Sequence, residues 1–230
     1  MIDKIVGVST ASVDNNEILN YIKEIEFAGA DRLHCDVMDG LVVKKSTYDE
    51  AGLEVILANT KLPVDVHLMV YQPHKQIKKY LKVNPQSIIL QYDHFSYEKQ
   101  LRKVLKKIRK AGIKAGLALS PNIPVSYILP FVPYIDILLI LGTDINASQG
   151  KLFEGAYDKI KNAVDLKNRF RRELIVAFKG GINFDNANKL YEAGVNALIV
   201  DELVRDCFSR TYAIENLKNT KSSLIGTKSL

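Results

Sequence analysis

The chain has 230 residues, of which 47% are hydrophobic and 25% charged, a balance that is ordinary for a soluble globular protein with one large core. Its net charge of +6 is spread out and accompanies no recognised nucleic-acid-binding motif, so we expect no nucleic-acid partner. No apolar run is long enough to predict a membrane span, and two cysteines do not make a disulfide framework, so the expected location is the reducing cytoplasm.

One pattern repeats along the chain: a short apolar run with β-branched residues alternates with an amphipathic stretch, eight times. A glycine closes three of the expected helices just before a strand, where a glycine C-cap is typical. The expected strands cover residues 4–9, 32–36, 64–69, 87–91, 114–119, 135–141, 174–178 and 197–200. The expected helices cover residues 17–27, 47–58, 74–80, 97–110, 126–131, 157–167, 184–192 and 204–216.

Strands separated by helices indicate parallel β-α-β units, and eight such units predict an α/β fold with a single (β/α)8 TIM barrel. We expect this one domain to span residues 1–217, with a doubly wound open sheet as the alternative architecture. Residues 218–230 are rich in Lys, Ser and Thr without a clear apolar period, so we expect them to form a flexible C-terminal tail.

Candidate ligands lie in the second and third expected strands. Residues two apart in a strand face the same side, so His34, Asp36 and Met38 share one face, and His67 lies in the next strand. Two imidazoles and a carboxylate at barrel strand ends are a suitable donor set for a divalent metal, and Asp36 is also placed to move a proton. Cys35 faces the other side and is expected to be a buried thiol.

Motifs follow one another at the strand ends in chain order. They are residues 9–14 (STASVD), 34–40 (HCDVMDG), 65–69 (DVHLM), 118–121 (ALSP) and 179–182 (KGGI). Together they resemble the ribulose-phosphate 3-epimerase family of barrels, and the similarity runs over nearly the whole chain. The second and third matches are the specific ones, because chance is an unlikely source of both in order.

In that family, two aspartates on opposite faces of the substrate move a proton at the carbon beside a ketone. A divalent metal held by two histidines and both aspartates stabilises the enediolate. The resemblance implies that His34, Asp36 and His67 are metal ligands and that Asp36 is one acid/base. The expected ion is Zn²⁺, with Fe, Mn and Co as alternatives.

The same resemblance implies a substrate and its contacts. The reaction would invert C3 of a ketose phosphate of the ribulose 5-phosphate/xylulose 5-phosphate type, so the partner would be a small sugar phosphate. A homo-oligomer is a further expectation from the resemblance. Residues expected to contact the substrate are Ser9, Met38, Met69, Gly180 and Gly181.

The chain departs from the family pattern at the site itself. Lys179 stands where the family has its second aspartate, and we interpret it as the other acid/base or as the electrophile. Its ammonium would repel a metal, which leaves open a site without one, and a salt bridge to Asp36 or Asp201 without catalysis is the alternative. Asp201 and Glu202 replace a Gly-Ser pair and would repel a phosphate, but acidic residues are also ordinary at a helix start.

These departures leave two other functions open. One is a lyase, aldolase or isomerase that acts through Lys179 on another keto-sugar. The other is a non-catalytic relative that binds a sugar or a protein.

Overall fold

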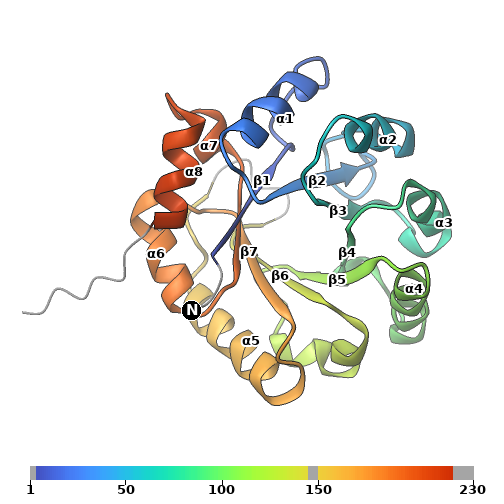
Figure 1. Ribbon diagram of the computed structural model, residues 1–230. Helices are drawn as coiled ribbons and strands as arrows, with labels where there is room; N and C mark the ends of the chain where they lie inside the picture. The colour runs from blue at the N-terminus through green and yellow to red at the C-terminus, as the bar shows by residue number, and fades with distance from the viewer. Residues whose placement is uncertain (1–3, 145–149, 220–230) are drawn as a thin grey trace, which may run out of the picture.

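Eight parallel strands form a closed barrel in the chain order β1 to β8, with the helices arranged around it (Figure 1). The computed structural model describes residues 4–144 and 150–219. The closed barrel confirms the (β/α)8 prediction over the open sheet. The strands are β1 (Ile5–Ser9), β2 (Arg32–Met38), β3 (Val64–Met69), β4 (Ser87–Gln91), β5 (Lys114–Leu119), β6 (Ile137–Leu141), β7 (Ile175–Lys179) and β8 (Ala197–Val200).

The connections between strands are helical, as the alternating pattern predicts. The helices are α1 (Ile18–Phe27), α2 (Glu50–Ala58), α3 (Pro73–Val83), α4 (Glu98–Lys110), α5 (Ala156–Phe170), α6 (Phe184–Glu192), α7 (Glu202–Arg205) and α8 (Arg210–Asn219). Two 3-10 segments, η1 (Tyr92–His94) and η2 (Val125–Tyr134), follow β4 and β5. No helix in residues 4–144 and 150–219 is both long and apolar enough to cross a membrane.

Two of the expected helices differ from the structure. The segment after β5 is the 3-10 helix η2, because Pro130 and Pro133 lie inside it and have no N–H to donate. The single helix expected over residues 204–216 is two helices, α7 and α8. Ser209 separates them, and its Oγ accepts a hydrogen bond of 3.2 Å from the backbone N–H of Tyr212, as an N-cap does.

The last expected segment, residues 218–230, falls mostly outside the described residues. Its first two residues, Lys218 and Asn219, form the end of α8. The Lys218 Nζ donates to the carbonyl oxygen of Gly29, at 2.7 Å, and to the carboxylate of Asp31, at 2.6 Å. These bonds hold the end of α8 against the segment between α1 and β2.

The barrel interior is polar on one side and apolar on the other. Strands β4 to β8 fill it with a buried apolar cluster that includes Ile89, Leu139 and Ile199. Strands β2 and β3 contribute charged and imidazole side chains, starting with Arg32, whose guanidinium binds the buried carboxylate of Asp65. The next inward positions toward the carboxyl ends of these strands carry the candidate ligands, so the pleat of two adjacent strands determines where the site lies.

Candidate active site

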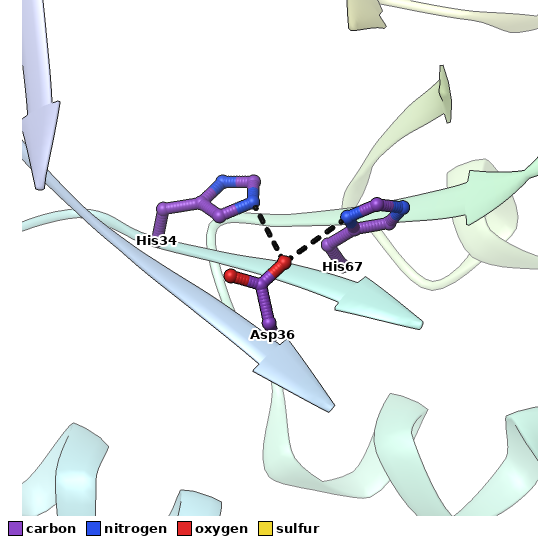
Figure 2. A group of neighbouring side chains, drawn as sticks. All are labelled: His34, Asp36 and His67. Carbon is purple, nitrogen blue, oxygen red and sulfur yellow. Dashed lines mark hydrogen bonds and ion pairs between the residues drawn. The ribbon is translucent and has the colours of Figure 1, made fainter. Parts of the chain in front are cut away.

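The three candidate metal ligands come together through the register of β2 and β3, in which Asp36 pairs with His67. All three side chains are buried. Asp36 Oδ1 lies 3.5 Å from His34 Nε2 and 3.2 Å from His67 Nδ1, so one carboxylate oxygen faces both imidazoles (Figure 2). One ligand atom from each residue lies within 4.8 Å of the others, a spacing compatible with one bound ion.

The His34 ring favours a metal ligand over an ordinary buried histidine. Neither of its ring nitrogens has a hydrogen-bond partner within the described part of the chain. The 3.5 Å separation from Asp36 is too long for a good N–H···O bond, and a buried imidazole without partners is costly. Burial lowers the pKa of His34 and the nearby Lys179 charge lowers it further, so the neutral, ligating form is favoured.

The hydrogen bonds of the His67 ring also favour a role as a metal ligand. Its Nε2 lies 3.0 Å from Oε1 of Gln91, whose amide nitrogen donates to Asp93 at 2.6 Å and to Ser120 at 2.8 Å. Those two donations orient Gln91, so His67 must donate from Nε2. The other ring nitrogen, Nδ1, faces Asp36 Oδ1 at 3.2 Å and lies on the side of the candidate ion. A metal ligand whose other ring nitrogen donates to a neighbouring side chain has this arrangement.

Lys179 and Ser9 bind the other oxygen of Asp36. The Lys179 Nζ donates to Oδ2, and the Ser9 hydroxyl donates to the same atom at 2.9 Å. Burial would raise the pKa of Asp36, but the charge of Lys179 holds it well below its usual value. The carboxylate therefore stays ionised, with one oxygen on a cation and the other toward the imidazoles.

The predicted substrate-contacting methionines lie beside this group. Met38 and Met69 are paired in the β2–β3 register and pack with Val43 in a small buried cluster. All three line a cavity of about 1140 Å³ at the carboxyl ends of the strands, into which Asp36, His67 and the other predicted residues Lys179, Gly180 and Gly181 also open. One cavity is thus lined both by the charged and imidazole side chains and by the apolar side chains, as is usual for a small-molecule site.

The two glycines after β7 retain the shape of a close turn. Both have positive φ, +97° for Gly180 and +67° for Gly181, and a Cβ on Gly180 would lie 2.6 Å from Thr143 Oγ1. The helix that follows is already capped: Asn183 and Asn186 bond reciprocally, each accepting from the other's backbone N–H at 2.9 Å. The backbone N–H groups of Asn183 and Asn186 at the start of α6 are therefore already bonded within the helix cap.

Four further residues support the site and were not assigned a role from the sequence. Gln91 at the end of β4 holds His67, Asp93 in η1 holds Gln91, and Ser120 Oγ donates to Asp93 at 2.8 Å. Lys159 of α5 reaches the end of β5, where its buried Nζ donates to the carbonyl oxygen of Ser120 at 2.5 Å. The available signal was the position of Gln91 and Asp93, two residues apart at and just after the end of a predicted strand, where residues of a barrel reach the site.

Asp201 lies at the same cavity, directly after β8. Its carboxylate accepts a hydrogen bond from the Ser12 hydroxyl and makes no capping bond to α7. Burial raises the pKa of Asp201 above its ordinary value, although Ser12 and Lys179 act in the opposite direction. Helix capping, the ordinary explanation for this carboxylate, is therefore not its role.

Comparison with known proteins agrees with this geometry. The model of the Ribulose-phosphate 3 epimerase family matches residues 5–204. The chain belongs to this family. Relatives include the ribulose-phosphate 3-epimerase of Bacillus subtilis (strain 168), 30% identical over 94% of this chain and 99% of that protein. The chloroplastic ribulose-5-phosphate-3-epimerase of Arabidopsis thaliana is 29% identical over 95% of this chain and 78% of that protein.

Solved structures give the same architecture. A 3-hexulose-6-phosphate synthase superposes with a TM-score of 0.69 at 12% identity, covering 95% of this chain and all of the other. At that identity the likeness concerns the fold alone. Family membership itself supports an epimerase over a lyase, an aldolase or a non-catalytic relative.

Proposed function

We propose that this protein inverts C3 of a ketose phosphate, interconverting compounds of the ribulose 5-phosphate and xylulose 5-phosphate type through an enediolate. The observation that carries the proposal is Asp36, an ionised and fully buried carboxylate with a cation on one oxygen and two imidazoles at the other. A proton beside a carbonyl is weakly acidic, so its removal needs both a base and positive charge near the developing oxyanion. Asp36 and its partners supply both.

In this proposal each residue has a distinct task. Asp36 removes the C3 proton, and Ser9 orients its carboxylate. Lys179 is the positive centre for the enediolate oxygen; its Nζ contacts Asp36, so it approaches from the same side and is better placed as an electrophile than as the acid on the opposite face. Met38 and Met69 form apolar walls that keep water from the reacting carbon.

We further propose that His34, Asp36 and His67 hold a divalent ion, with Zn²⁺ as the expected metal. Two observations support this assignment: the His34 nitrogens have no hydrogen-bond partner among the described residues, and His67 Nε2 is bonded to Gln91 while Nδ1 faces Asp36. When bound, such an ion would stabilise negative charge on the enediolate oxygens. The two carboxylate oxygens of Asp36 have different partners, so Lys179 can remain bonded to Oδ2 while Oδ1 faces the imidazoles.

The phosphate end of the substrate is proposed to lie over Gly180 and Gly181. Lys44 and Lys151 at the cavity rim offer charges that offset Asp201 and Glu202. A homo-oligomer and a cytoplasmic location remain further proposals. The free thiols of Cys35 and Cys207 are compatible with a reducing compartment.

The test is conversion of ribulose 5-phosphate to xylulose 5-phosphate, followed by NMR with added Zn²⁺ and after chelation. We expect conversion by the wild type and a rate lower by roughly 10²- to 10⁴-fold in Asp36→Asn, the usual range for loss of a general base. Circular dichroism of the variant controls for folding. Absence of conversion by the wild type, or equal rates for the two proteins, would contradict the proposal.

A further inference from the structure

Lys179 stands where the family has its second aspartate, so one acid/base for inversion is missing. A proton-transferring group is still needed on the substrate face opposite Asp36. We propose that Asp201 is this second acid/base and that Lys179 serves as the cationic centre for both carboxylates. The inference rests on the proposed function and moves the missing carboxylate from the end of β7 to the end of the neighbouring strand, β8.

The order of strands around the barrel places these groups. Lys179 ends β7, Asp201 follows β8, Ser9 ends β1 and Asp36 lies near the end of β2, in four adjacent strands. Asp36 and Asp201 therefore lie on opposite sides of β1. Lys179 interacts electrostatically with both of them, and its Nζ bonds Asp36 directly.

Ser9, at the end of β1, and Ser12, just after it, each bind one of the two carboxylates. Ser9 donates its hydroxyl hydrogen bond to Asp36, and Ser12 donates its own to Asp201. Each carboxylate is thus oriented by one serine from the same short segment, residues 9–12. Arg205 fixes that segment further, because its guanidinium donates to the carbonyl oxygen of Ser12 at 2.9 Å.

Asp201 does not cap the helix that follows it, unlike a comparable aspartate elsewhere in the chain. Asp49, which caps α2, accepts a hydrogen bond of 3.0 Å from the backbone N–H of Gly52, whereas Asp201 makes no such bond to α7. Its side chain lines the cavity instead. The charges that act on it are those of Lys179, Asp36 and Arg205, and it also interacts electrostatically with the Tyr21 phenol. Burial raises its pKa, which favours the protonated form that a proton donor needs.

The chemistry balances with these two groups. The Asp36 carboxylate takes the C3 proton, the C–H electron pair forms the C2=C3 bond, and the carbonyl π pair moves to O2, near the Lys179 ammonium. Asp201 then gives its proton to C3 on the other face as the C2=O bond re-forms. Asp36 ends protonated and Asp201 ionised, which is the starting state of the reverse reaction, and exchange with water resets the pair. One epimer therefore loses its proton to Asp36, and the other loses it to Asp201.

The test is solvent exchange at C3 in heavy water, measured separately from ribulose 5-phosphate and from xylulose 5-phosphate. We expect Asp201→Asn to retain exchange from one epimer and to lose it from the other, with epimerisation lower by roughly 10²- to 10⁴-fold. Asp158→Asn is the matched control, since it makes the same change at an exposed carboxylate outside the cavity, and we expect its kcat to equal that of the wild type. Ser12→Ala, which removes only the hydroxyl partner of Asp201, should slow the same epimer selectively.

Each other outcome overturns the inference. Equal exchange from both epimers by Asp201→Asn and the wild type would remove Asp201 from the reaction while leaving the proposed function intact. Loss of exchange from both epimers would assign Asp201 to binding instead. An inactive wild type toward both ketose phosphates would overturn the proposed function, and this inference with it. Thermal unfolding of Asp201→Asn and Ser12→Ala verifies that each variant is folded.

Discussion

Restoring the family's second aspartate by Lys179→Asp should convert a weak divalent-ion site into a tight one. In the wild type, the Lys179 ammonium bonds Asp36, the same residue whose other oxygen faces His34 and His67. An ion held by those three residues would therefore lie close to a positive charge. The substitution removes that charge and adds a carboxylate ligand.

The magnitude follows from Coulomb's law. A divalent ion about 5 Å from an ammonium is repelled by about 2 kcal/mol at the dielectric constant of water and by about 7 kcal/mol at an effective value of about 20. Even the smaller figure corresponds to roughly thirtyfold in affinity. We therefore expect Lys179→Met to bind Zn²⁺ at least about tenfold more tightly than the wild type. Lys179→Asp should gain at least about a hundredfold.

Isothermal titration calorimetry of the chelator-treated proteins with Zn²⁺ measures these affinities. Lys44→Asp, with the same change of charge at the exposed cavity rim, controls for the net charge of the protein and should change affinity less than about twofold because solvent screens it. Equal Zn²⁺ affinities for Lys179→Asp and the wild type would refute the reasoning. They would show that Lys179 does not oppose an ion at His34, Asp36 and His67.

Three other predictions concern the support of the site. Gly142→Ala should destabilise the fold by about 1 to 3 kcal/mol in urea unfolding and lower activity, because its Cβ would lie 2.4 Å from the Gly180 carbonyl oxygen; an unchanged midpoint would contradict this. Gln91→Leu should weaken Zn²⁺ binding by roughly 10- to 100-fold by removing the partner of His67 Nε2, and calorimetry showing equal affinity would count against the assigned tautomer. Burial lowers the pKa of Lys159 from 10.5 to about 8, so the unfolded chain keeps this proton at higher pH than the folded one. Below about pH 8 the folded protein bears the full cost of burying the Lys159 charge. As the pH rises from about 8 to 10.5, the wild type should therefore gain stability relative to Lys159→Met. A stability difference in urea unfolding that stays constant over this pH range would refute the prediction.

The sequence was sufficient to predict the barrel because each strand and helix has its own periodicity. β3, β4, β5 and β8 begin and end at the predicted residues, since each is an apolar run bounded by polar or turn residues. The errors arose where one local feature overrides the pattern. Two prolines turn the expected helix after β5 into 3-10 geometry, and Ser209 starts a new helix inside a continuous amphipathic stretch.

The sequence predicted which residues of the site lie on inward strand faces, but not which of them contact one another across different strands. Alternation along β2 and β3 places His34, Asp36 and His67 on inward faces, and the structure brings all three together. The partner of Lys179 was left open between Asp36 and Asp201, because residues on different strands meet only after the barrel closes. Asp36 is its bonded partner. The bond between Ser12 and Asp201 joins residues 189 positions apart, so no local pattern could indicate it.

The most direct test of the account is where deuterium appears when the wild type acts on ribulose 5-phosphate in heavy water. The account requires the C3–H bond to break and a solvent proton to return to the opposite face. Xylulose 5-phosphate that carries deuterium at C3 is the predicted product, observed by NMR. Xylulose 5-phosphate that retains its C3 hydrogen, or ribulose 5-phosphate left unchanged and unlabelled, would contradict proton transfer at C3 by this site.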